Sequence, residues 1–375
     1  MEKKRIVIAS DSFKGTLSSL EICRLFQNEI KNREDIEATY LPIADGGEGS
    51  LDAISHILEG RYIDIEVYNL YLNKMKTRFF VDKHDNAYIE TASCAGLTIA
   101  REENDPGMVS TFGLGQQIVK AVQLGYKNIY VFLGGSATND GGVGLAIGMG
   151  AKFFNKSKEQ FIPAGLTLKE ISRIDNSKPQ ALLKGINVYA LCDVKSPFYG
   201  KEGAAYKFAR QKGADEDEIK ELDDGLKYLA KIINRDLGVD VSKIEGAGAA
   251  GGLGGGLFAF ANAKMCSGIG TVLNLIKFEN QILNSDIIIS GEGKLDRQTL
   301  DGKVIDGVAK RCLKMNKPLA LIVGISELSL KEVQKVYPCV KYLFETNEKH
   351  LPFEEVKASS RKDYTHQIKK LLSNI

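Results

Sequence analysis

Six short segments of this sequence are rich in glycine, carry acidic, basic or hydroxyl side chains, or do both, and most of them directly follow a predicted buried strand. They are 11–15 (DSFKG), 44–50 (ADGGEGS), 134–142 (GGSATNDGG), 192–194 (CDV), 246–251 (GAGAAG) and 291–296 (GEGKLD). Ligands of open parallel sheets bind beyond the carboxyl ends of the strands, so residues there are candidates for chemistry. Acids suit magnesium or proton transfer, lysines suit a carboxylate or phosphate, and glycines let backbone N–H groups approach an anion.

The first, second and fourth segments supply one candidate lysine and three candidate acids. Lys14 can neutralise a carboxylate or phosphate, although a solvated loop lysine would give the same pattern. Asp45 and Glu48 on a glycine-rich loop suit magnesium or a general base, and equally a turn followed by a helix cap. Asp193 follows a predicted strand at 188–191, where either a catalytic carboxylate or an N-cap could lie.

The third segment is the strongest candidate for a phosphate or nucleotide site. The residues expected to contact the phosphates are Gly134, Gly135, Ser136, Thr138, Asn139 and Asp140. The hydroxyls can bond phosphate oxygens, and the last two side chains can hold a metal or a substrate hydroxyl. A structural strand-to-helix turn is the alternative, but so long a run of small and polar residues exceeds what a turn requires.

The last two segments give one candidate and one exclusion. Glu292, Lys294 and Asp296 add two acids and a cation, or form a surface loop with compensating charges. Residues 246–251 match GxGxxG, but no buried strand precedes them, so we reject a dinucleotide site and expect close helix packing or a phosphate contact. No GxxxxGK[ST], HRD…DFG or GxSxG pattern occurs.

The apolar patterns predict how these segments are positioned. Strands are expected at 6–9, 38–43, 62–67, 78–81, 87–90, 129–133, 188–191, 286–290, 319–323 and 342–344. Helices are expected from Ser18, through 51–57, and at 112–124, 216–237, 304–313 and 365–372. Two strands from the start and three from the end can form one doubly wound parallel sheet. We therefore predict an α/β domain of residues 1–63 and 286–375, with a second α/β domain, 64–285, inserted; a split into halves is the alternative.

Composition excludes several classes of protein. The 375 residues suggest two domains, and 43% hydrophobic with 26% charged residues is ordinary for globular chains. A net charge of +2 leaves no electrostatic footprint for nucleic acid or an anionic membrane. No apolar stretch has membrane length and the N-terminal apolar run is too short for a signal peptide, so we expect a cytoplasmic protein. Scattered cysteines and histidines disfavour disulfides and zinc, leaving hard oxygen ligands for any metal.

With QKGAD at 211–215, these motifs resemble the bacterial glycerate kinase family, type I and glycerate 2-kinase-like, along the whole chain. Lys294 stands where that family commonly has arginine. The resemblance implies a flavodoxin-like domain carrying an inserted α/β domain. It also implies phosphoryl transfer from ATP to D-glycerate with Mg²⁺, giving 2-phosphoglycerate as in most relatives or 3-phosphoglycerate as in some. Glycerate and ATP would be the partners, without nucleic acid or membrane, in a monomer or homodimer.

The residues at the strand ends then receive roles. We expect Asp193 as general base with Asp45 second, Lys14 beside them, and Mg²⁺ on Asp45, Glu48 and Asp193. The substrate would contact Ser12, Lys14, Glu292, Lys294 and Asp296, and residues 134–140 would cradle phosphates in a cleft between the domains. A kinase for another small hydroxy acid, a non-catalytic sensor of glycerate or nucleotide, and a dehydrogenase remain as alternatives.

Overall fold

The computed structural model describes residues 3–47, 49–297, 299 and 302–375. The chain forms two compact units, and each is described by itself. Unit 1 comprises Met1–Asp45, Asp52–Leu58 and Ile269–Ile375, and unit 2 comprises Gly46–Leu51 and Glu59–Gly268. The boundaries expected from sequence, after 63 and before 286, lie near these divisions without coinciding with them.

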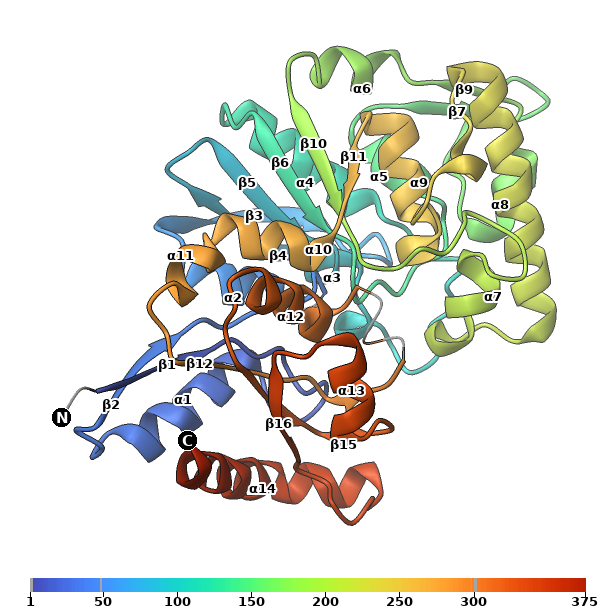
Figure 1. Ribbon diagram of the computed structural model, residues 1–375. Coiled ribbons are helices and arrows are strands. Elements are labelled where there is room, and N and C mark those ends of the chain that lie inside the picture. Colours follow the sequence, from blue (N-terminus) through green and yellow to red (C-terminus); the bar gives the residue numbers. More distant parts are fainter. Residues whose placement is uncertain (1–2, 48, 298, 300–301) are drawn as a thin grey trace. The chain divides into compact units, whose positions relative to one another are not determined.

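Unit 1 is built on a five-stranded parallel sheet in the order β16-β14-β12-β1-β2 (Figure 1). Its strands are β1 (Lys4–Ile8), β2 (Ile36–Tyr40), β12 (Ile287–Ser290), β14 (Leu319–Val323) and β16 (Val340–Glu345). Numbered along the chain, the spatial order is 2-1-3-4-5, which is the flavodoxin-like order. This confirms the predicted fold class, a doubly wound sheet assembled from both ends of the chain.

Helices cover both faces of this sheet. The helices of unit 1 are α1 (Ser19–Ile30), α10 (Gly268–Leu275), α11 (Phe278–Ile282), α12 (Val304–Lys314), α13 (Leu330–Val336) and α14 (Phe353–Asn374). Helices α1 and α14 lie side by side on one face, with α12 and α13 on the other (Figure 1). All residues of β12 and β14 are buried because central strands covered on both faces need apolar side chains throughout. The capping box of Ser18 and Glu21 starts α1, as the sequence predicted.

Unit 2 contains a six-stranded mixed sheet in the order β11-β10-β6-β5-β4-β3. Its strands are β3 (Gly60–Tyr68), β4 (Lys74–Asp82), β5 (Asn86–Glu90), β6 (Asn128–Phe132), β10 (Asn187–Leu191) and β11 (Lys264–Cys266). The first three are antiparallel neighbours, as expected for consecutive strands without helices between them, and the other pairings are parallel. Short strands β7 (Lys152–Phe154), β8 (Gln160–Phe161) and β9 (Arg173–Asp175) form a separate sheet.

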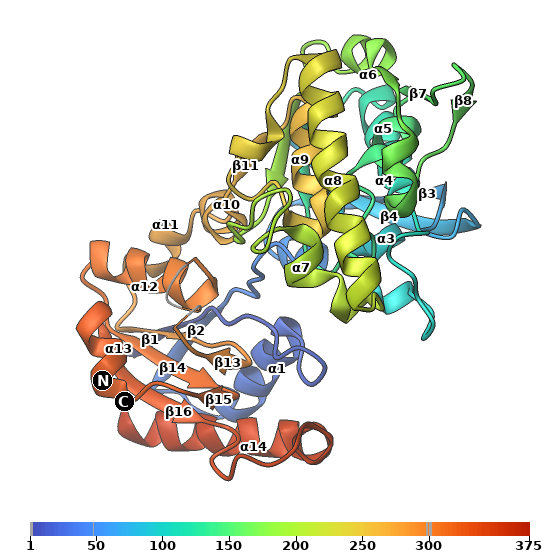
Figure 2. The ribbon, with the colours of Figure 1, turned by 90° about the vertical axis from the view of Figure 1, so that its right-hand side faces the viewer.

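The helices of unit 2 include the longest ones predicted from sequence. They are α3 (Ala92–Ala95), α4 (Phe112–Gln123), α5 (Val143–Gly148), α6 (Ser177–Leu182), α7 (Ala204–Phe208), α8 (Glu216–Leu237) and α9 (Ala249–Ala261). Helix α8, which lies beside α9 in Figure 2, begins after an Asp215 N-cap and ends at Gly238, whose backbone is left-handed. The short helix α2 (Ser50–Ser55) includes residues of both units.

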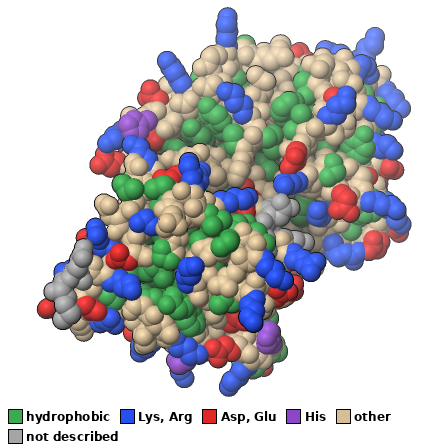
Figure 3. All heavy atoms as spheres, viewed as in Figure 1, with side chains coloured by type: hydrophobic (Ala, Val, Ile, Leu, Met, Phe, Trp, Pro, Cys, Tyr) green, Lys and Arg blue, Asp and Glu red, His purple; other side chains and the backbone are tan. Residues whose placement is uncertain are grey.

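The surface carries charges of both signs. Basic and acidic side chains are interspersed over the face shown in Figure 3, in keeping with the net charge of +2. Among the described residues, no helix combines the length and apolarity that crossing a membrane would need.

Candidate active site

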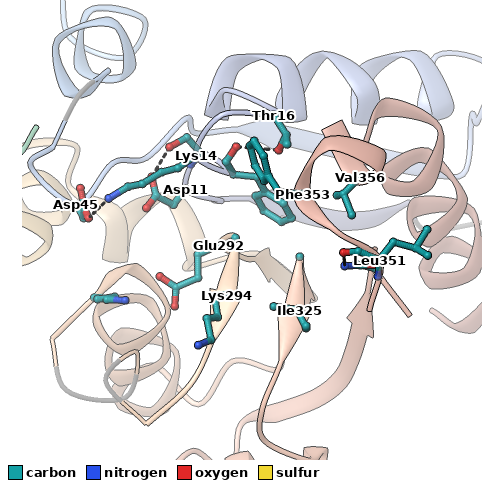
Figure 4. A pocket seen from close by; sticks show the side chains of 16 residues that line it. Asp11, Lys14, Thr16, Asp45, Glu292, Lys294, Ile325, Leu351, Phe353 and Val356 are labelled. Carbon is teal, nitrogen blue, oxygen red and sulfur yellow. Dashed lines mark hydrogen bonds and ion pairs between the residues drawn. The ribbon is translucent and has the colours of Figure 1, made fainter. Parts of the chain in front are cut away.

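Unit 1 has a cavity of about 460 Å³ next to the carboxyl ends of β1 and β12 (Figure 4). The direction of the chain connections reverses between these two strands, so the loops that follow them diverge and leave a crevice. The polar residues lining it include Asp11, Ser12, Lys14, Asp45, Glu292, Lys294 and Lys303. The structure therefore brings together Ser12, Lys14, Asp45, Glu292 and Lys294, which the sequence had placed in three separate motifs.

Backbone contacts hold the two loops against each other. The amide of Asp11 donates to the carbonyl oxygen of Gly291 at 2.9 Å, and the Ser10 hydroxyl donates to the same oxygen at 3.1 Å. A β-carbon at Gly291 would lie 1.8 Å from the carbonyl oxygen of Ile322, so only glycine fits there. These contacts fix Asp11 and Glu292 as neighbours although 281 positions separate them along the chain.

Two of the carboxylates are almost fully buried, since Asp11 and Glu292 are each 5% exposed. Burial raises the pKa of Asp11 well above its usual range, and the nearby charge of Asp45 raises it further. Burial likewise raises the pKa of Glu292 to about 7. The Oε1 atom of Glu292 has no hydrogen-bond partner among the described residues. These carboxylates are in an environment that a cation would stabilise.

The lysines lie around this acidic centre. Lys14 is largely exposed, with its Nζ 3.9 Å from a carboxylate oxygen of Asp45. The Nζ of Lys294 lies 2.7 Å from Glu327 and 3.7 Å from Asp296, which places Asp296 beside the cavity. Positive charge is therefore available for an anionic substrate. Lys294 is also paired with two acidic side chains, Asp296 and Glu327.

Two charged residues of the cavity were missed by the sequence reasoning, and so were the polar residues Thr16 and Asn347. Asp11 carried a usable signal, because it directly follows the first buried strand and its linker residues, Ala9 and Ser10. Lys303 carried none, because it precedes helix α12 and no predicted strand end lies next to it.

The described carboxylates fit a magnesium ion only in part. No group of three histidine, cysteine or acidic side chains among the described residues is arranged to hold a metal by itself. Magnesium commonly takes one or two carboxylates and completes its shell with water and phosphate oxygens. The orphaned oxygen of Glu292, with Asp11 and Asp45 nearby, suits that partial shell. Of the ligands expected from sequence, Asp45 lies here, Asp193 belongs to unit 2, and Glu48 lies outside the described residues.

The 134–142 loop follows β6 in unit 2, and its polar groups face inward. Asp140 is fully buried, and its carboxylate accepts hydrogen bonds from the backbone N–H groups of Thr111, Gly142 and Gly144. The Thr111 hydroxyl donates to it as well, at 2.9 Å. Asp140 therefore anchors this loop to the start of α4, and its expected contact with phosphate or metal stays a prediction.

Other residues of the loop also contact neighbouring parts of the protein. The hydroxyls of Ser136 and Thr138 are buried and lie 2.9 Å apart. The amide of Gly134 donates to Gly46, and a β-carbon at Gly134 would lie 2.3 Å from the Cα of Gly47. Glycine at this position thus lets the two backbones approach each other closely.

Gly135 and Asn139 are the remaining two residues of this loop that were expected from sequence to contact the phosphates. Gly135 has a φ of 76°, which favours glycine, and its carbonyl accepts from the amide of Leu97. Asn139 is fully buried, and neither polar atom of its side chain has a hydrogen-bond partner among the described residues. Its side-chain amide therefore still suits the polar contact expected from sequence.

Lys212, in the QKGAD motif, is a buried cation that supports the same loop. It is 3% exposed, and its Nζ donates to the carbonyl oxygen of Thr138 at 2.7 Å. The side chain of Asn104 donates to the carbonyls of both Lys212 and Ala137. Burial lowers the pKa of Lys212 to about 7.

Asp193 follows β10 in unit 2, as the sequence predicted. Its Oδ1 accepts from the Ser267 hydroxyl at 2.7 Å and from the Gly268 amide at 3.0 Å. The carboxylate is thereby oriented by the segment that follows β11. Its expected pairing with Asp45 stays a prediction.

The GxGxxG segment is a packing element. Residues 250–252 have positive φ, and a β-carbon at Gly251 would lie 2.0 Å from the carbonyl oxygen of Thr138. The glycines bring the start of α9 onto the 134–142 loop, in agreement with our rejection of a dinucleotide site.

Glu292 gives a first testable prediction. Its pKa is about 7 in the fold against 4.5 unperturbed, so the native state binds more protons between these values and loses stability as pH rises through them. The Glu292→Gln variant escapes that loss. Its free energy of unfolding should exceed that of the wild type by up to about 3 kcal/mol above pH 7, and the gain should fade toward pH 5. Urea unfolding without added metal, at pH 5 and pH 8, measures this.

The exposed Glu34 provides the matched control for that measurement. A Glu34→Gln variant should follow the wild type at both pH values. A Glu292→Gln variant that shows the same gain at pH 5 and pH 8 would contradict the raised pKa.

A flavodoxin-like unit with acids and lysines lining a pocket at its switch point, in one chain with a second α/β unit, is the architecture of an α/β enzyme. The model of the glycerate kinase family matches residues 6–375. This chain belongs to the glycerate kinase family, which confirms the resemblance and the expectation of an enzyme.

Several individual proteins are similar to this chain. A glycerate kinase from Bacillus cereus is 39% identical over 323 residues, which cover 85% of each chain. Glycerate 2-kinase from Escherichia coli is 36% identical over 323 residues, with the same coverage of both chains. The crystal structure of a protein assigned as glycerate kinase 2 from Salmonella typhimurium LT2 aligns with a TM-score of 0.83 at 32% identity, covering 100% of this chain and 98% of its own.

Proposed function

We propose that this protein transfers a phosphoryl group from ATP to D-glycerate, with Mg²⁺ bound, and forms 2-phosphoglycerate. Membership of the glycerate kinase family supports the substrate, and the name of the Escherichia coli relative supports the 2-position. The observation that carries the proposal is the pocket of unit 1, where the buried acids Asp11 and Glu292 lie among three lysines. Phosphoryl transfer needs this combination, because catalysis consists mainly of positioning and charge neutralisation.

One or two of the three carboxylates Asp11, Asp45 and Glu292 would hold the metal, and water and phosphate oxygens would complete its shell. Magnesium, when bound, would neutralise negative charge on the phosphates. Its charge would also keep Glu292 deprotonated near neutral pH, where burial otherwise favours the protonated acid. The side chains of Asp11, Asp45 and Glu292 line the same cavity, as Figure 4 shows.

The lysines would bind the anions that share the pocket. Lys14 and Lys303 line the cavity, and Lys294 reaches it from β13 (Lys294–Leu295). Lysine is a mobile point charge suited to a phosphate or a carboxylate. In the absence of substrate, the side chain of Lys294 pairs with the carboxylates of Asp296 and Glu327.

In the reaction, the substrate hydroxyl oxygen would bond to the γ-phosphorus of ATP while the bond to the β–γ bridging oxygen breaks, so that ADP leaves. A carboxylate would accept the hydroxyl proton. Asp193 is our first candidate, because Ser267 and Gly268 orient its carboxylate, and Asp45 is the second. A reaction site between the two domains stays a prediction.

The Asp193→Asn variant should lower turnover of glycerate by at least about tenfold, the lower end of general-base effects, because the amide cannot accept the proton. Steady-state release of ADP measures this. The exposed Asp217 on α8 provides a control, since Asp217→Asn should retain wild-type turnover. Near-normal turnover by a folded Asp193→Asn variant would remove Asp193 from the role.

Phosphorus NMR of the product tests the reaction itself. Incubation with ATP, Mg²⁺ and D-glycerate should give 2-phosphoglycerate and ADP. A panel of other small hydroxy acids in the same assay identifies any better substrate. Glycerate or ATP binding without ADP release would overturn the proposal in favour of a sensor.

A further inference from the structure

The cavity of unit 1 has an apolar end in addition to its acidic and basic end. The apolar lining comes from Ile325, Leu351, Phe353 and Val356, and Figure 4 shows these side chains on the side away from Asp45. Phe353 is 51% exposed and Leu351 is 39% exposed. Neighbouring exposed apolar side chains that line a cavity commonly mark a ligand surface.

The ring of Phe353 is supported by the loop that also carries the polar residues. A β-carbon at Gly15 would lie 2.7 Å from the ring, and Gly15 has a φ of +79°, so this position favours glycine for two reasons. The 11–15 loop therefore presents Asp11 and Lys14 to one end of the cavity and supports an aromatic ring at the other.

The opposite part of the apolar wall is held in place before any ligand binds. The side chain of Asn347 donates to the carbonyl of Leu351 at 3.0 Å and accepts from its amide at 2.8 Å. Ile325 lies on β15 (Ile325–Ser326), which pairs with the strand that carries Lys294. The apolar and polar ends thus share rigid elements as well as one cavity.

We propose that this apolar end, with Phe353 as the stacking residue, binds the adenine base of ATP, an assignment that rests on the proposed function. A purine has flat apolar faces, and aromatic side chains stack on them. A nucleotide joins such a base to a polyanion, and the cavity joins an apolar wall to a set of lysines and metal-binding acids. Phe353 contacts the base and is a binding residue rather than a catalytic one.

The exposure of the side chains favours the apolar end of the cavity over the 134–142 loop as the binding site of the base. The hydroxyls and the carboxylate of that loop are bonded internally, whereas Phe353 and Leu351 are exposed beside the lysines. The nucleotide is thereby assigned to unit 1, where the sequence alone had suggested substrate contacts.

The experiment uses fluorescence and exploits the absence of tryptophan from the chain. The Phe353→Trp variant has a single indole at the proposed stacking position, and ADP with Mg²⁺ should quench its emission while inorganic tripolyphosphate should not. Leu283, 54% exposed in unit 1 and outside the cavity lining, provides the control Leu283→Trp, whose emission should not respond to ADP.

A second variant measures affinity. By calorimetry, Phe353→Ala should weaken ADP binding by roughly tenfold or more, as expected for loss of one base–aromatic stack, and leave tripolyphosphate binding unchanged. Because this side chain is half exposed, the substitution should leave the fold intact, and circular dichroism of the variant checks this.

The outcomes separate this inference from the proposed function. Unchanged ADP affinity in Phe353→Ala, absence of ADP binding to the wild type, or equal quenching by tripolyphosphate would overturn the base site, even if glycerate is phosphorylated. Quenching by ADP together with weaker ADP binding to Phe353→Ala would support it, even if the enzyme fails to phosphorylate glycerate.

Discussion

Replacing Asp11 by asparagine is expected to lower kcat for glycerate phosphorylation by at least about 100-fold, the scale seen when one group that stabilises transition-state charge is removed. The substitution keeps the shape of the side chain and removes its charge. Asp11 is buried next to Asp45 and Glu292, so an amide there removes one of the three carboxylates available to magnesium. The rate of ADP release measured over a range of Mg²⁺ concentrations should also show that the variant needs more Mg²⁺ than the wild type to reach half of its maximal rate.

The stability of the same variant should change in the opposite direction. The raised pKa of Asp11 shows that the fold favours its neutral form, and asparagine is neutral. We expect the melting temperature at pH 8 without metal to equal or exceed that of the wild type. A folded variant with wild-type activity and an unchanged Mg²⁺ requirement would refute the metal-binding role.

A control for Asp11 lies on the surface of the same unit. Asp35 forms an exposed ion pair with Arg33, an arrangement that contributes little to stability. The Asp35→Asn variant should keep the activity and the magnesium requirement of the wild type. Comparable losses in both variants would show that the effect is not specific to the cavity.

Replacing Lys212 by methionine is expected to change how stability depends on pH. Lys212 titrates at about 7 in the fold against 10.5 unperturbed, so the unfolded chain binds more protons in this window. Wild-type stability relative to the Lys212→Met variant should therefore rise by about 4 kcal/mol between pH 7 and pH 10. Below pH 7 the charged lysine lowers the stability of the wild type, and methionine, similarly long and unbranched, does not.

Denaturant unfolding of both proteins at several pH values measures that difference. The exposed Lys184 in unit 2 provides the control, and Lys184→Met should show a difference that does not vary with pH. A constant difference for Lys212→Met would mean that Lys212 remains charged in the fold across the whole range. The hydrogen bond to Thr138 would then be its main contribution.

Local sequence was sufficient for elements whose signals are local. Helix α8 occupies the predicted 216–237, because Asp215 caps its start and a left-handed Gly238 ends it. Helix α14 was predicted only over 365–372 and begins at Phe353, because its first turns are mostly exposed and carry little apolar periodicity. Strand β2 begins and ends earlier than predicted, because the apolar run continues past it into the buried residues 41–44.

The candidate site was predicted in part for a related reason. Lys14, Asp45 and Glu292 follow strands of one parallel sheet, and carboxyl ends of parallel strands share an edge, so their convergence followed from the pattern. The inward-facing role of Asp140 could not be predicted, because a glycine-rich turn has the same composition whether its polar groups bind a ligand or the protein. Phe353 carried no chemical signal, since its place in the cavity brings it against a glycine more than 300 residues away in the chain.

The sequence by itself determined the family, the α/β class and the strand ends that carry polar residues, because each of these is recorded in short, contiguous patterns. Only the tertiary structure decided that β1 pairs with β12, that Asp11 and Glu292 share one buried cavity, and that the 134–142 loop faces inward. Strand order, burial and side-chain direction depend on hydrogen bonds and packing between residues far apart in the chain, and no local pattern specifies them.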